Sequence, residues 1–203
     1  MAFEFPAMTQ PSAGRAAFCV PGWTLRPAGN ADESFLRRLY RTLRDDGAAF
    51  AGWDEAMITA FCNDQFDFQH ADWTHRYPDA QFLIVIGNGA PIGRLYLDLS
   101  GASLHLIDIG LLPAWRRRGF GTAALGELKR RAAAANGSAT LRVARDNHAA
   151  AALYARQGFV AGESFASHVA MAWRPAFGER DAIDAAAPPG MAATPHSRSE
   201  PRA

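Results

Sequence analysis

The chain has 203 residues, of which 49% are apolar and 20% are charged. This length suits one well-cored domain with a short remainder, and the net charge of +1 provides no general attraction to nucleic acid or to an anionic membrane. Cys19 and Cys62 are too few for a disulfide framework, and no His-Glu-x-x-His sequence indicates a metal site. No apolar run approaches the roughly 20 residues of a membrane span. We therefore expect a cytoplasmic protein with no metal, nucleic-acid or membrane partner.

The two ends of the chain differ in composition from its middle. In residues 1–20, Pro, Gly and Ser interrupt any regular period, and residues 176–203 mix Ala, Pro, Ser and scattered charge. We predict a flexible N-terminal segment (1–20), one folded domain (21–175) and a disordered C-terminal tail (176–203).

Within the folded domain, short β-forming runs alternate with helical patterns. Gly87-Asn88-Gly89 indicates a hairpin turn, and Asn136-Gly137 is typical of a helix C-terminus. Hairpins followed by a β-α-β-α-β pattern predict a mixed α/β sheet. Strands are predicted over 23–26, 81–86, 91–99, 103–112, 139–143 and 168–173, and helices from a cap at Asn30 or Asp32 to Leu43 and over 54–76, 121–135 and 149–157.

The segment from Leu111 to Ala123, LLPAWRRRGFGTA, combines a strand end, three arginines and two glycines that open a helix. Glycines let backbone N–H groups approach an anion, and a helix N-terminus adds unpaired N–H donors and the positive end of its dipole. The arginines can add charge-assisted hydrogen bonds. The pattern predicts a site for phosphate or pyrophosphate, but it is neither a Walker motif nor G-x-G-x-x-G. A surface arginine cluster before an ordinary helix is the alternative.

These residues resemble the pyrophosphate-binding signature of the GNAT superfamily of N-acetyltransferases, read here as Arg116-x-x-Gly119-x-Gly121. The segment from Asn147 to Phe159 resembles that family's second signature, N-x-x-A-x-x-L-Y-x-x-x-G-F. The resemblance implies a GNAT-like fold: a central mixed, mostly antiparallel sheet flanked by helices, in which two parallel strands, about 104–112 and 139–143, splay apart. Continuous pairing of those two strands would contradict it.

The resemblance also implies acetyl-CoA as the co-substrate and assigns residues to it. The pantetheine arm would pair with the open strand edge as an added strand does. Leu111 and Leu112 would then contact the donor through their backbone, and Asn147 would bind the pantetheine arm or simply cap its helix. The residues around the pyrophosphate would be Arg116, Arg117, Arg118, Gly119, Phe120, Gly121 and Thr122.

Within that resemblance, Tyr154 is the best catalytic candidate. The reaction is attack of an amine on the thioester through a tetrahedral intermediate, and a phenol near the sulfur can protonate the leaving thiolate. The family often places a carboxylate base six positions before the residue matching Leu111, where this chain has His105. A histidine can accept a proton near neutral pH. Asp108 is the second candidate, although strict alternation places it on the opposite face of the strand from His105.

The acceptor is less defined than the donor. We expect a primary amine of a small molecule, with a protein N-terminus or a lysine as the alternative, and a homodimer is possible. Two other classes stay open: a non-catalytic acyl-CoA-binding sensor, and an unrelated phosphate-binding α/β protein. The aromatic stretch from Phe61 to Tyr77 either lines the acceptor pocket or packs in the core.

Overall fold

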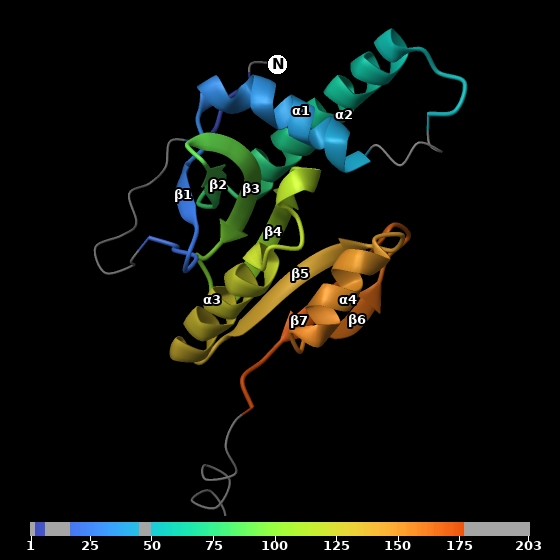
Figure 1. Cartoon of the computed structure of the whole chain (residues 1–203). Coiled ribbons are helices and arrows are strands. Elements are labelled where there is room, and N and C mark those ends of the chain that lie inside the picture. The colour runs from blue at the N-terminus through green and yellow to red at the C-terminus, as the bar shows by residue number, and fades with distance from the viewer. Residues whose placement is uncertain (1–2, 7–16, 45–49, 177–203) are drawn as a thin grey trace, which may run out of the picture.

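A computed structural model describes residues 3–6, 17–44 and 50–176 of the chain (Figure 1). The predicted tail beyond residue 176 lies outside these residues, so its predicted disorder stays a prediction. Observed helix and strand boundaries fall within one or two residues of most predicted ones. The elements are β1 (Thr24–Pro27), α1 (Glu33–Arg44), α2 (Glu55–Arg76), β2 (Gln81–Gly87), β3 (Ala90–Asp98), β4 (Ser103–Leu111), α3 (Phe120–Ala134), β5 (Ser138–Ala144), α4 (His148–Arg156), β6 (Val160–Ser164) and β7 (His168–Trp173).

The strands form one seven-stranded sheet in the order β1-β2-β3-β4-β5-β7-β6. All neighbouring strands are antiparallel except β4 and β5, which are parallel. The predicted hairpin joins β2 to β3, with Asn88 and Gly89 both at positive φ, as a two-residue turn of type I′ requires. This sheet confirms the predicted mixed, mostly antiparallel fold. Only β6 was not predicted; its residues are all exposed, so no apolar alternation marks it.

The parallel pair β4–β5 is short and then opens. Pairing runs from Ser103 opposite Ser138 to Leu106 opposite Leu141. Beyond these residues β4 continues to Leu111 without β5 as its partner, while the end of β5 pairs on its other side with β7. The two strands diverge in this region (Figure 1). The predicted splay is therefore confirmed, and β4 has an open edge after Leu106.

A β-bulge lies where β4 begins to leave β5. The register with β3 passes from Leu106 opposite Leu97 to Asp108 opposite Tyr96, so Ile107 has no partner of its own. An extra residue of this kind reverses the alternation of the side chains that follow it. His105 lies opposite Asp98, which shares a face of β3 with Tyr96. His105 and Asp108 therefore lie on the same face of the sheet, and the prediction that they face opposite sides was wrong.

Side chains on the two faces of the sheet form two separate cores. On β3, Leu95 and Leu97 pack against α3, whereas Tyr96 packs beneath α1 and α2. We call these the α3/α4 face and the α1/α2 face. The first core also contains Phe120, Leu125 and Leu128 of α3 with Tyr154 of α4, and the second contains Leu36, Leu39 and Tyr40 of α1 with Cys62 and Phe66 of α2.

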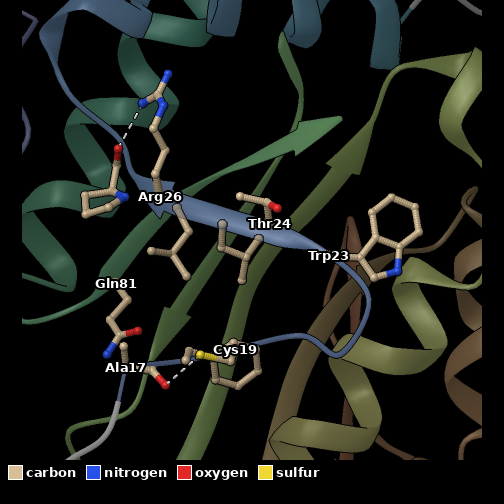
Figure 2. A pocket seen from close by; sticks show the side chains of 10 residues that line it. Ala17, Cys19, Trp23, Thr24, Arg26 and Gln81 are labelled. Carbon is tan, nitrogen blue, oxygen red and sulfur yellow. Dashed lines mark hydrogen bonds between the residues drawn. The ribbon is translucent and has the colours of Figure 1, made fainter. Parts of the chain in front are cut away.

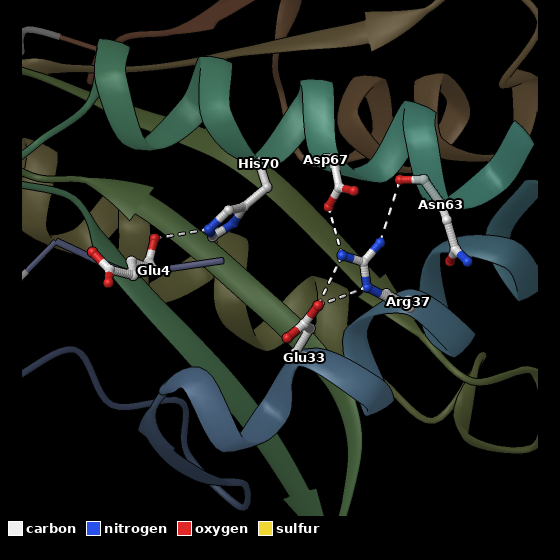
Figure 3. A network of polar contacts seen from close by, with 6 residues as sticks. All are labelled: Glu4, Glu33, Arg37, Asn63, Asp67 and His70. Carbon is white, nitrogen blue, oxygen red and sulfur yellow. Dashed lines mark hydrogen bonds and ion pairs between the residues drawn. The ribbon is translucent and has the colours of Figure 1, made fainter. Parts of the chain in front are cut away.

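A polar network joins α1 to α2 across the second core. Arg37 of α1 forms ion pairs with Glu33 and with Asp67 of α2 (Figure 3). One turn further along α2, His70 has its Nε2 2.8 Å from the Glu4 carbonyl oxygen. These contacts fix α2 over the sheet and bring the residues around Glu4 against it.

Part of the segment before residue 21 packs against the domain. Phe18 and Val20 are buried in the core of the α3/α4 face. On the other face, the Phe3 ring stacks on Phe66 and on His70, with centroids 5.7 and 4.2 Å apart. The packed part of the chain thus includes residues that the predicted boundary at 21 assigned to the flexible segment.

A cavity of about 410 Å³ lies along the edge strand β1, between Phe18, Trp23 and Leu83 (Figure 2). It is separated from the open part of β4 by the width of two strands of the sheet. None of the predicted site residues lines it. Across the described ranges, no helix has the length and apolar character that crossing a membrane requires.

Candidate active site

The turn before α3 has the geometry of an anion cradle. Arg117 and Gly119 both adopt positive φ, and Gly119 is the N-cap of α3 without any side-chain cap. A Cβ added at Gly119 would meet nothing within 4 Å, so the turn faces open space. Within the described chain, the backbone N–H groups of residues 117–122 donate to no backbone acceptor. Such a row of free N–H groups at a helix N-terminus binds phosphate groups.

The three arginines of the cradle differ in their contacts. Arg116 donates from Nε to the Leu111 carbonyl oxygen at 2.9 Å, which ties the turn to the end of β4. Arg118 lies over the Trp115 ring, 4.9 Å from its centroid. Arg117 is exposed beside the same turn. The predicted pyrophosphate residues are therefore gathered around one helix N-terminus, with Arg116 also supporting the strand.

The open edge of β4 offers backbone groups beside this cradle. Leu112 donates its N–H to Ile92 at 2.9 Å and accepts from Trp115 at 2.9 Å, so both of its backbone groups have partners within the chain. By the alternation of an antiparallel ladder, Ile109 and Leu111 direct their N–H and C=O groups away from β3. Of the two predicted backbone contacts, Leu111 thus faces the open edge, where its carbonyl oxygen already accepts from Arg116. Ile109 shares that orientation and was missed, although its spacing of two from Leu111 was a usable signal.

Helix α4 lies next to the cradle and begins at Asn147. The Asn147 carboxamide oxygen accepts from Ala150 N–H at 3.1 Å, so this residue caps α4. Its amide nitrogen has no hydrogen bond to any described residue. A Cβ added at Gly121 would lie 2.9 Å from the Leu153 side chain, which means that the second glycine allows α3 to approach α4. Phe120 directs its ring into the core, so any anion contact there uses its backbone.

Tyr154 lies on α4 with its ring in the core of the α3/α4 face and is 6% exposed. Its hydroxyl forms no hydrogen bond with any described residue. Burial raises the pKa of Tyr154 above its usual value, and the nearby negative charge of Asp108 raises it further. The phenol therefore keeps its proton at neutral pH. The charge of Asp108 thus acts on the Tyr154 hydroxyl without a hydrogen bond between the two side chains among the described residues.

Asp108 lies in the splayed half of β4, just beyond the last pair with β5. Its Oδ2 accepts from Arg94 Nε of β3 at 2.6 Å, while its Oδ1 has no hydrogen-bond partner in the described part of the chain. The side chain is 25% exposed. A carboxylate held through one oxygen, with the other free and reachable, can accept a proton from a substrate.

His105 lies in the paired half of β4, away from the open edge. Its Nδ1 is 2.9 Å from the Thr140 hydroxyl of β5, and its ring stacks on Tyr77 at 5.7 Å between centroids. Burial lowers the pKa of His105, with a further contribution from the positive charge of Arg142. No contact joins it to Tyr154 within the described residues. The structure thus places Asp108 in the splayed half of β4 and His105 in its paired half.

The aromatic stretch of α2 mainly supports the fold. Phe66 is buried, and Trp73 meets the Tyr96 ring edge to face at 5.8 Å. Phe68 is 72% exposed and contributes to neither core. Among the described residues, no cluster of three or more His, Cys, Asp and Glu side chains could hold a metal ion.

Comparison with solved structures finds the same fold in several acetyltransferases. The structure matches PaiA N-acetyltransferase from Thermoplasma acidophilum, crystallised with coenzyme A, with a TM-score of 0.58 at 18% identity over 76% of this chain and 99% of that one. It matches a GCN5-related N-acetyltransferase from Rhodopseudomonas palustris with a TM-score of 0.54 at 20% identity, covering 79% and 100%. An acetyltransferase from Thermus thermophilus gives 0.54 at 19%, covering 78% and 100%.

The acetyltransferase (GNAT) family matches residues 37–159, which is more than half of the chain. The chain therefore belongs to the GNAT family of acetyltransferases. A search of curated proteins found no significant match. Family membership makes the chain an acyltransferase that uses acetyl-CoA, and the matched residues include both signatures, the bulge and the splayed strands.

Proposed function

We propose that the chain is an N-acetyltransferase that transfers the acetyl group of acetyl-CoA to a primary amine of a small molecule. The observation that carries this proposal is the position of Asp108 in the splayed half of β4, where its negative charge acts on the buried hydroxyl of Tyr154. One residue offers a free carboxylate oxygen and the other a protonated phenol. Direct attack of an amine on a thioester needs a base and an acid in these two roles.

The donor is held by the cradle and the open edge. When bound, acetyl-CoA supplies an acetyl group activated as a thioester. Residues 117–122 hold its pyrophosphate through backbone N–H groups, with Arg117 and Arg118 adding positive charge. Ile109 and Leu111 receive the pantetheine amides as an added strand. Asn147, whose carboxamide oxygen caps α4, donates from its amide nitrogen to the pantetheine arm.

Asp108 accepts and Tyr154 donates a proton in this reaction. The Asp108 carboxylate accepts one proton from the arriving ammonium group, which frees the nitrogen lone pair. As the new C–N bond forms and the C–S bond breaks, the electron pair of the C–S bond passes to sulfur, and Tyr154 donates its proton there. The second proton of the nitrogen and the proton held by Asp108 leave to solvent, and Tyr154 takes one proton up again, so the net products are the amide, the thiol and one proton.

The burial of the two groups favours a slender acceptor. The Asp108 side chain is 25% exposed and Tyr154 is 6% exposed, so little of either group is open to a bulky acceptor. A small primary amine does this more readily than a side chain on a folded protein surface. The net charge of +1 gives no support to a nucleic-acid partner. Peptide N-termini, lysine side chains and a homodimeric assembly are secondary proposals.

The test measures amine-dependent release of coenzyme A thiol, with the product identified by mass spectrometry. The panel contains ethanolamine, phenethylamine, methionine, a short peptide with a free N-terminus and Nα-acetyl-lysine. We expect the free small amines to be acetylated fastest. Faster turnover of the peptide or the lysine derivative would move the acceptor class to proteins. Saturable binding of acetyl-CoA without release for any amine would support the sensor alternative and contradict the proposal.

The variant Tyr154→Phe tests the acid. We expect kcat to fall about 100-fold, because the thiolate then leaves without a proton donor. The Kd of acetyl-CoA should change little, since the phenol ring is retained and only its hydroxyl is lost. An unchanged kcat would remove Tyr154 from the mechanism.

A further inference from the structure

Arg94, in the middle of β3, is a buried cation that neither signature motif includes. It is 2% exposed and lies on the α1/α2 face. Removing a guanidinium from water costs several kcal/mol, which a paired carboxylate offsets only with good geometry. Asp108 provides that carboxylate, with Oδ2 2.6 Å from Arg94 Nε.

The rest of the guanidinium is held by α2 and by β3 itself. Arg94 Nη2 donates to the Gln69 side-chain oxygen at 3.1 Å. The guanidinium carbon lies 5.1 Å from the centroid of the Trp73 ring and 5.4 Å from that of Tyr96. A planar cation suits such a site between aromatic rings, and a lysine ammonium would reproduce the charge but not the fork or the stacking. Arg94 is therefore fixed in position by three neighbours besides Asp108.

The two side chains of this ion pair differ in exposure. The Arg94 side chain is 3% exposed, whereas that of Asp108 is 25% exposed. Arg94 holds the inner oxygen of the carboxylate, and the other oxygen has no partner within the described residues. A buried ion pair is seldom more stabilising than well-packed apolar residues. The main effect of this arrangement is therefore to orient the Asp108 carboxylate and not to stabilise the fold.

We propose that Arg94 is a positioning residue for acetyl transfer: it clamps Oδ2 of Asp108 so that Oδ1 meets the acceptor amine. This inference rests on the proposed function, in which Asp108 is the base. Arg94 touches neither the donor nor the acceptor and acts only through Asp108.

Other titratable groups interact with the charges of this pair. Tyr96 of β3 and Tyr154 of α4 interact with the charge of Asp108, and burial raises the pKa of each. Tyr40 of α1 and His70 of α2 interact with the charge of Arg94, and burial raises the pKa of Tyr40 and lowers that of His70. All three tyrosines therefore stay neutral near pH 7.

The experiment compares Arg94→Lys, Arg94→Met, Asp108→Asn and the double variant Arg94→Met/Asp108→Asn, using the panel amine that the wild type acetylates fastest. Arg26→Met is the matched control, because it also breaks an arginine–aspartate pair, between Arg26 and Asp32, outside the site. Urea unfolding and calorimetric titration with acetyl-CoA establish that each variant is folded and binds the donor.

We expect Arg94→Met to lower kcat about tenfold or more with little change in the KM of acetyl-CoA, because the Asp108 carboxylate loses its clamp. Arg94→Lys should also lower kcat, since the charge remains and the clamp does not. The double variant should be no slower than Asp108→Asn, because Arg94 acts through Asp108. Arg26→Met should keep wild-type kcat and KM.

Wild-type kcat in both Arg94 variants would overturn the inference, as would losses in the double variant that multiply. If Arg94→Met does not fold, Arg94→Lys decides: an unchanged kcat there contradicts the clamp. A wild-type protein that binds acetyl-CoA but acetylates no amine overturns the proposed function together with this inference. An active wild type with indifferent Arg94 variants overturns the inference alone.

Discussion

The two faces of the sheet are built from different chemistry. The core of the α3/α4 face consists of apolar and aromatic side chains, and its functional groups are the backbone N–H groups at the N-terminus of α3 and the Tyr154 phenol. The α1/α2 side holds the buried polar residues of the described chain: Asp32, His70 and Arg94. A donor that is the same in every turnover can be bound by backbone geometry. Recognition of an amine needs a charged side chain, and the charge requires buried partners that hold it in place.

Substitutions of Asp108 and His105, the two titratable residues on β4, should lower kcat/KM by very different amounts. Asp108→Asn should lower kcat/KM about 100-fold or more, because the base is lost, and should leave the Kd of acetyl-CoA unchanged. His105→Gln should stay within about threefold of the wild type in kcat/KM, because His105 contacts Thr140 and Tyr77 in the paired half of the strand. Steady-state kinetics with one amine measures both. A larger loss in His105→Gln would reverse the assignment of the base.

Some of these features could be predicted from the sequence and others could not. The cradle at Gly119 and the position of Tyr154 could be predicted because each lies in a contiguous signature. The shared face of His105 and Asp108 could not, since it depends on a bulge at Ile107 that has no local signal. Strict alternation therefore gave the wrong face for Asp108.

The hydrogen bond from Arg94 to Asp108 could not be predicted from the sequence either. Arg94 is 14 residues from Asp108 and 25 from Gln69, on separate elements that only the folded sheet brings together. Arg94 also interrupts an apolar run of β3 and was read simply as part of a strand. A charged residue inside such a run was the available signal, but it does not identify its partner.

A smaller effect is expected on the donor side. Gly119→Ala should raise the Kd of acetyl-CoA about tenfold, because a side chain at φ +89° is strained and relief of that strain turns the N–H groups away. Gly126→Ala is the control: it lies within α3, where an added Cβ meets nothing within 4 Å, and it should leave the Kd unchanged. Calorimetric titration compares the two. Equal Kd values would mean that the turn does not bind the donor.

The smallest effect concerns stability on the α1/α2 side. Burial lowers the pKa of His70, opposed by its hydrogen bond to Glu4, so the folded state binds a proton less readily than the unfolded state. The contribution of His70 to the free energy of unfolding is therefore complete above the ordinary histidine pKa of about 6.5, and it decreases as the pH drops below that value. His70→Gln should reduce this fall between about pH 7.5 and 5.5, whereas replacement of the exposed His75 by Gln should not. Urea unfolding at both pH values measures it; identical slopes in the two variants would contradict the assignment to His70.

Hydrogen exchange with saturating acetyl-CoA shows whether the donor binds at the open edge of β4 and the turn before α3. Amides in residues 107–111 and 117–122 should exchange more slowly with acetyl-CoA, while those in 103–106, already paired with β5, should not change. ADP should slow only residues 117–122. If acetyl-CoA binds saturably and leaves both segments unchanged, or protects residues 17–27 beside the cavity at β1 instead, the account is contradicted.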